Sequence, residues 1–161
     1  MKIKIKLSEL LYFSAFFIWL LFNFIAQTNL VYKYPEIYRF RIVAMIVSIV
    51  ILLFKLLLER HSSKFLIFFF SAFCLAIIIG ITTHKLFDAL TIISTILFII
   101  SINNVNFRKV LILWTVSIVL LMISIYGLLK FGIIENTLRV QLGGRFRFSQ
   151  GYQYVTLGAN Y

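Results

Sequence analysis

Arginines near the C-terminus are the side chains of this 161-residue chain best suited to chemistry. Arg139, Arg145 and Arg147 lie in a polar, glycine-bearing segment that follows a series of long apolar runs. A guanidinium is always charged, and its planar fork matches two oxygens of a phosphate. Where a bilayer meets water, such groups are suited to binding a lipid-linked phosphate or pyrophosphate. On spacing alone, the simpler alternative is that they anchor an amphipathic loop at the lipid headgroups.

The residues around these arginines predict a short hairpin. Apolar and polar residues alternate on both sides of Gly143-Gly144, as in two strands joined by a tight turn. A loop lying against the membrane is the alternative. The aromatic residues after the glycines are suited to packing against sugar rings or an acyl chain, and Gly151 permits a close approach of the backbone.

The run from residue 145 to residue 156 contains Arg147, Ser149, Gly151, Tyr152, Tyr154 and Thr156. This spacing resembles a signature of bacterial polysaccharide polymerases, the Wzy-type, O-antigen-ligase-like membrane proteins. In Gram-positive members the signature looks like Arg-x-Ser-x-Gly-[Phe/Tyr], followed by His-Pro-Asn or by Tyr-x-Thr. This chain lacks the His and Pro, so no role of that His is transferred to it. The matching residues are Arg147, Ser149, Gly151 and Tyr152 in the first part, and Tyr154 and Thr156 in the looser second part.

The resemblance implies a glycosyl transfer at the outer face of the bacterial cytoplasmic membrane. Such a polymerase moves a growing glycan from its undecaprenyl-pyrophosphate carrier onto the next lipid-linked repeat unit, with no metal or other cofactor. Family members are far longer, so this chain would be an N-terminal part that is inactive alone. Departure of the pyrophosphate concentrates negative charge, which a preorganised arginine stabilises. The resemblance thus implies catalytic roles for Arg147 and, as second choice, Arg145, and substrate-binding roles for Ser149, Gly151, Tyr152, Tyr154 and Arg139.

The composition requires a membrane protein to position these residues. Hydrophobic residues make up 62% of the chain and charged residues only 13%, against about 25% charged in soluble domains. The net charge of +11 does not indicate nucleic-acid binding, because the cations lie mostly in short connectors between apolar runs. The single cysteine, Cys74, excludes a disulfide within the chain, and the two histidines are too far apart in sequence for metal-ligand spacing. The predicted fold class is an all-α, polytopic transmembrane bundle.

Five apolar runs approach the ~20 residues that a membrane-spanning helix needs. They predict spans near residues 10–30, 42–58, 65–81, 86–101 and 110–129, which together form a transmembrane region over 1–131. The first is too long for the apolar core of a signal peptide and is expected to be retained. Residues 132–161 form the arginine-bearing tail, whose last ten residues are apolar enough to begin a sixth span.

The positive-inside rule orients this chain with its N-terminus in the cytoplasm and its tail outside. Lys55, near the end of the second run, is expected to extend its amine toward the headgroups. If they were topogenic, Lys130, Arg139, Arg145 and Arg147 would make the outer cations as numerous as the inner ones, but the three arginines lie well beyond the last helix. The inner side collects Lys2, Lys4, Lys6, Lys55, Arg60, Lys64, Arg108 and Lys109, and the outer side Lys33, Arg39, Arg41 and Lys85.

A second function class stays open. The chain is also compatible with a small non-enzymatic membrane protein, such as a bacteriocin-immunity-like factor or a transporter subunit, whose tail is only an interfacial anchor. The expected partners are the undecaprenyl-pyrophosphate-linked oligosaccharide, membrane lipid and other membrane proteins of polysaccharide assembly.

Overall fold

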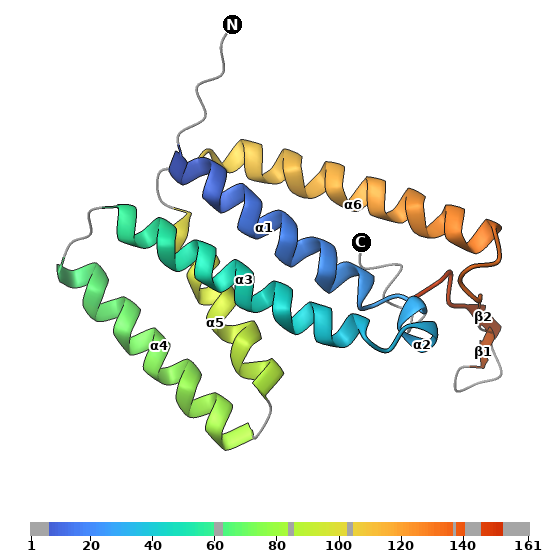
Figure 1. Cartoon of the computed structure of the whole chain (residues 1–161), viewed down its shortest axis with the longest axis horizontal. Helices are drawn as coiled ribbons and strands as arrows, with labels where there is room; N and C mark the ends of the chain where they lie inside the picture. The colour runs from blue at the N-terminus through green and yellow to red at the C-terminus, as the bar shows by residue number, and fades with distance from the viewer. Residues whose placement is uncertain are drawn as a thin grey trace, which may run out of the picture. The chain divides into compact units, whose positions relative to one another are not determined.

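The computed structural model describes residues 7–59, 63–83, 86–102, 105–136, 138–140 and 146–152. Apart from one short hairpin, the described chain is helical (Figure 1). The helices are α1 (Leu7–Ile25), α2 (Leu30–Lys33), α3 (Ile37–Leu58), α4 (Ser63–Thr83), α5 (Leu86–Ser101) and α6 (Phe107–Lys130), and the strands are β1 (Leu138–Val140) and β2 (Phe146–Phe148).

The helices confirm the predicted all-α membrane fold. Within the residues that the structure describes, three helices, α1, α3 and α6, are long and apolar enough to cross a bilayer by length and composition. Shorter apolar helical stretches, Phe69–Thr82 and Ala89–Ser101, lie within α4 and α5. Five membrane crossings therefore stay a prediction, while association with a membrane follows from the apolar helices.

The first helix ends earlier than its apolar run. We expected a span to about residue 30, but α1 ends at Ile25 and the short α2 follows after a turn. Thr28 explains the break, because its hydroxyl donates to the Ile25 carbonyl (2.7 Å) and accepts from the Leu30 amide (3.3 Å). Such local side-chain bonds offer the backbone an alternative to the helix.

The chain divides into two compact units. Unit 1 comprises Met1–Trp19 and Ile42–Leu111, and unit 2 comprises Leu20–Arg41 and Ile112–Tyr161. The core of unit 1 is built from aromatic and aliphatic side chains, with the Tyr12 and Phe98 rings edge to face at 5.8 Å. A hydrogen bond between two helices lies beside this core: Trp19 Nε1 of α1 donates to Ser94 Oγ of α5 at 3.2 Å. The buried cluster is Tyr12, Ala15, Leu52, Leu56, Leu97, Phe98, Ile100 and Val110.

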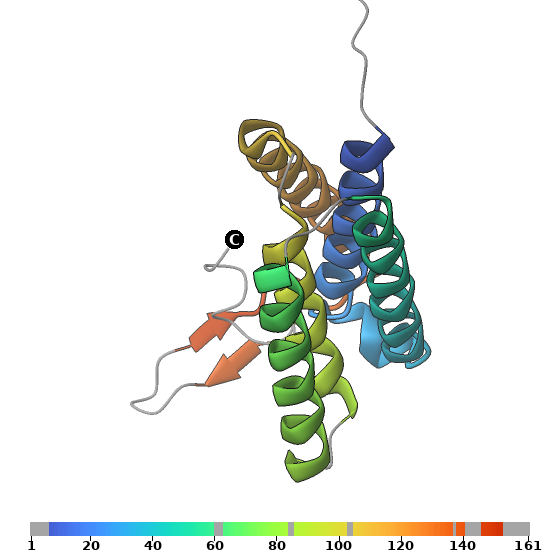
Figure 2. The same ribbon diagram turned by 90° about the vertical axis from the view of Figure 1, so that its left-hand side faces the viewer.

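Helices α4 and α5 form a closely packed pair within unit 1. They lie side by side in both views (Figures 1 and 2). Gly80 of α4 faces Ala89 of α5 so closely that a Cβ on the glycine would lie 2.6 Å from the Ala89 Cβ. Small residues at this point allow the two backbones to approach, as is common between membrane helices.

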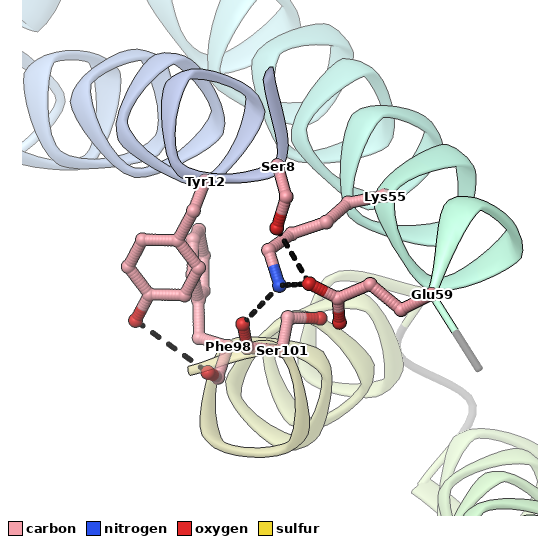
Figure 3. A network of polar contacts seen from close by, with 6 residues as sticks. All are labelled: Ser8, Tyr12, Lys55, Glu59, Phe98 and Ser101. Carbon is pink, nitrogen blue, oxygen red and sulfur yellow. Dashed lines mark hydrogen bonds and ion pairs between the residues drawn. The ribbon is translucent and has the colours of Figure 1, made fainter. Parts of the chain in front are cut away.

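A buried ion pair lies in the same unit, and it corrects the expectation for Lys55. The Lys55 side chain is fully buried and does not extend to the headgroups. Its Nζ donates to Glu59 Oε1 at 2.9 Å and to the Ser101 carbonyl at 2.6 Å, and the Ser8 hydroxyl donates to the same Glu59 oxygen at 2.5 Å (Figure 3). The lysine is held inward because Glu59, directly after α3, and Ser101, at the end of α5, supply it with oxygen acceptors.

The predicted hairpin of the tail is present. Strands β1 and β2 pair antiparallel, and Figures 1 and 2 show them as a short orange-to-red ribbon pair. The register places Leu138 opposite Phe148 and Val140 opposite Phe146. The Gly143-Gly144 turn and the start of a sixth span lie outside the described residues.

Candidate functional site

A tight turn follows β2 and contains the matched motif. Gln150 and Gly151 both have positive φ angles, 51° and 85°, and the Tyr152 amide donates to the Ser149 carbonyl at 3.0 Å. Two successive positive φ values with this bond are the features of a type I′ turn. The Gln150 amide donates to Asn136 Oδ1 at 3.0 Å, which ties the turn to the chain before β1. Ser149, Gly151 and Tyr152 are thus the first, third and fourth residues of a tight turn that reverses the chain direction.

The motif glycine is required at this position for two reasons. Its φ of 85° lies in the region that favours glycine. A Cβ there would also lie 2.9 Å from Ile125 Cγ2 and 3.2 Å from Leu129 Cδ1, both on α6. The turn therefore packs directly against the last turns of the helix, and a side chain at Gly151 would separate them.

Asn29, in the turn between α1 and α2, anchors the tail. Its backbone amide donates to the Gly151 carbonyl at 2.7 Å, and its Nδ2 donates to the Glu135 carbonyl at 2.9 Å and to Ser149 Oγ at 3.1 Å. The side chain is only 5% exposed, so these bonds are made away from solvent. Three bonds from one residue hold both ends of the hairpin to the same point.

Tyr152 completes the docking of the tail. It pairs with Thr28 in an isolated β-bridge, and its ring meets the Phe24 ring edge to face at 5.8 Å. Ser149 and Tyr152 are 1% and 3% exposed. These two residues and Gly151 therefore have structural roles in the described chain, and their predicted contacts with substrate stay a prediction.

The hairpin brings together two of the predicted arginines. Arg139 of β1 and Arg147 of β2 lie directly opposite each other in the register of the two strands. Like charges at opposed positions destabilise a strand pair unless something compensates them. An anion bound beside the two positions would do so. The other two predicted residues, Arg145 and Tyr154, lie outside the described chain.

Two cavities flank the docked tail within unit 2. One, here called the α6 pocket, has a volume of about 460 Å³ and lies between α6 and the turn. The other, of about 420 Å³, lies beside Asn29 and is also lined by Lys33 and Glu135. Asn29 Oδ1 has no hydrogen-bond partner among the residues that the structure describes. The residues lining the α6 pocket are Met122, Ile125, Tyr126, Leu129, Lys130, Asn136, Gln150 and Tyr152.

Asn29 is a residue of the site that the sequence did not predict. A signal was present, because Gln27-Thr28-Asn29 is a polar interruption late in an otherwise apolar run. Asn29 lies more than a hundred positions from Glu135 and Ser149 in the sequence, so its hydrogen bonds with them become visible only in the folded structure. No protein-family model, curated protein or solved structure matches this chain.

Proposed function

We propose that this chain is the N-terminal part of a membrane polysaccharide polymerase that joins undecaprenyl-pyrophosphate-linked repeat units. The observation that carries the proposal is the cross-strand pairing of Arg139 with Arg147 next to the docked motif. A pyrophosphate is the ligand that suits two opposed guanidinium groups, because each can bind phosphate oxygens in a bidentate way. Its negative charge would offset the repulsion within the ladder.

The chemistry assigned to the arginines is stabilisation of the leaving group. When the glycan leaves its carrier, negative charge develops on the lipid pyrophosphate. A donor fixed before the reaction stabilises that charge without having to reorganise. The hairpin is held at both ends by Asn29 and by the type I′ turn, so the backbone carrying Arg147 is fixed in this way. Arg147 is the proposed main contact and Arg145 the second choice, while Arg139, opposite Arg147 in the ladder, is proposed to bind the substrate.

The membrane placement follows the distribution of cations. We place the N-terminus in the cytoplasm and the tail on the outer face of the bacterial cytoplasmic membrane, in line with the lysines and arginines beside the apolar runs. The lipid-linked oligosaccharide would reach the tail from the outer leaflet. The chain by itself is proposed to bind the carrier but not to elongate a glycan, and further membrane proteins of polysaccharide assembly are its proposed partners.

The test is polymer length in cells that carry the gene at its native locus. Arg147→Ala is expected to abolish long surface polysaccharide on a gel, and Arg147→Lys to shorten it, because a point charge cannot make a two-pronged phosphate contact. Lys33→Gln, which removes an exposed cation elsewhere in unit 2, is the matched control and should leave the length unchanged. Normal polymer length in Arg147→Ala would refute the proposal.

One observation favours a second candidate function. Ser149, Gly151 and Tyr152 are turned into the protein, which is what a purely structural anchor for an interfacial loop requires. On this alternative the chain is a small non-enzymatic membrane protein, either an immunity-like factor or a transporter subunit. The two candidate functions differ in what they require at position 147. An anchor needs only a cation there, so lysine can replace Arg147, whereas the polymerase needs the guanidinium group itself. Full function of Arg147→Lys would favour the anchor.

A further inference from the structure

The α6 pocket combines an apolar wall with a polar rim. Its wall is formed by Met122, Ile125, Tyr126 and Leu129, which are spaced by three and four residues and so lie along one stripe of α6. The next position of that stripe is Lys130, the last residue of the helix. The opposite rim is supplied by Asn136 and Gln150 from the docked tail. A molecule filling this cavity would meet hydrocarbon along the helix and polar groups at its end.

The polar rim offers hydrogen-bond donors and a positive charge. The Lys130 side chain makes no ion pair or hydrogen bond with the rest of the described chain. Asn136 Oδ1 accepts a hydrogen bond from the backbone amide of Gln150, so Asn136 Nδ2 is still available as a donor. The side-chain amide of Gln150 donates to none of the described residues. No acidic residue lines the cavity in the part of the chain that the structure describes, so the rim is complementary to an anion.

The pocket also lies where a membrane lipid is available. Helix α6 is one of the three candidate membrane spans, and Lys130 is its last residue. Tyr126 and Phe131 are both strongly exposed beside it, as aromatic residues at the interface between hydrocarbon and headgroups commonly are. A cation at this level attracts anionic lipid headgroups.

We propose that the α6 pocket binds an anionic phospholipid of the surrounding bilayer. The acyl chain lies along the stripe from Met122 to Leu129, and the phosphate lies against Lys130, Asn136 and Gln150. Because Gly151 packs on Ile125 and Leu129 of the same stripe, the lipid also fills the space beside the docked turn. The proposal rests on the α6 stripe and on Lys130, Asn136 and Gln150, and none of these residues has a role in the proposed glycan transfer.

The test is lipid binding to the purified full chain in detergent micelles, measured by native mass spectrometry during titration with phosphatidylglycerol. Lys130→Gln is expected to weaken binding by about five-fold, the effect of removing one cation near a lipid surface. Lys33→Gln is the matched control and should bind as the wild type does. Equal affinity of Lys130→Gln and wild type would overturn the proposal.

Two further arms separate the parts of the lipid. Diacylglycerol, which has the acyl chains without the phosphate, and inorganic phosphate alone should each bind at least ten-fold more weakly than phosphatidylglycerol. Met122→Trp, which places a large ring in the pocket, should reduce phosphatidylglycerol binding, whereas Ile123→Trp, at an exposed neighbouring position outside the pocket, should not. Equal binding of diacylglycerol or of free phosphate would reject a phospholipid site, as would unimpaired binding by Met122→Trp.

Discussion

Replacing Lys55 by methionine should destabilise unit 1 strongly. The lysine is fully buried, and its Nζ donates to Glu59 Oε1 at 2.9 Å and to the Ser101 carbonyl at 2.6 Å. Methionine keeps most of the side-chain volume but removes the charge that compensates the Glu59 carboxylate, whose side chain is 9% exposed. Removing one partner of a buried ion pair costs about 3–5 kcal/mol. We therefore expect the free energy of unfolding to fall by about that amount.

A double variant distinguishes the ion pair from simple packing. In Lys55→Met with Glu59→Leu, no buried charge is left uncompensated, and such replacements are often neutral or stabilising by about 1–4 kcal/mol. The second substitution should thus recover most of the stability that the first one removes. A coupling energy of about 3 kcal/mol or more between the two positions is expected, at the upper end of measured pairs.

The assay is unfolding of the detergent-solubilised chain by titration with sodium dodecyl sulfate, followed by far-ultraviolet circular dichroism. Lys33→Met, which alters an exposed lysine, is the control and should change the free energy of unfolding by less than about 0.5 kcal/mol. The reasoning is refuted if Lys55→Met is as stable as the wild type. It is also refuted if the double variant is no more stable than Lys55→Met.

Two further predictions concern glycines at close contacts. Gly151→Ala should weaken docking of the tail by about 2–5 kcal/mol, because the new residue would adopt a positive φ and overpack against α6. Hydrogen exchange at the Asn29 backbone amide should then become faster. The control is Gly127→Ala, where a Cβ would meet nothing within 4 Å, and it should leave that exchange unchanged. Gly80→Leu should separate α4 from α5, because even a Cβ would lie 2.6 Å from Ala89, and a disulfide introduced between these two helices should form more slowly than in the wild-type background.

The helices were largely predictable from the sequence, because a bilayer requires long apolar runs. The predicted spans near 42–58, 65–81, 86–101 and 110–129 fall within α3, α4, α5 and α6. The end of α1 was not predicted, since an apolar count does not register the local hydrogen bonds of Thr28. The tail hairpin was predicted because its alternation is local to the strands.

The contacts that assemble the site could not be read from the sequence. The pairing of Arg139 with Arg147 depends on the register of the hairpin, which the pattern of alternation leaves open by even steps. The buried ion pair of Lys55 and Glu59 depends on Ser101, which lies 46 positions from Lys55, and on Ser8, which lies 51 positions from Glu59. Asn29 likewise meets the tail only in the folded chain. A single polar residue within an apolar run does not change the periodicity of that run, so sequence periodicity does not indicate which distant residue it contacts.

Binding of undecaprenyl pyrophosphate to the purified chain in lipid nanodiscs tests the central claim most directly. Wild type should bind it and discriminate against undecaprenol, which lacks the phosphates. Arg147→Ala should weaken the affinity by roughly ten- to a hundred-fold, as expected for the loss of a hydrogen bond to a charged group. Arg147→Lys should fall between the two. Equal affinity of wild type and Arg147→Ala for undecaprenyl pyrophosphate would contradict the account.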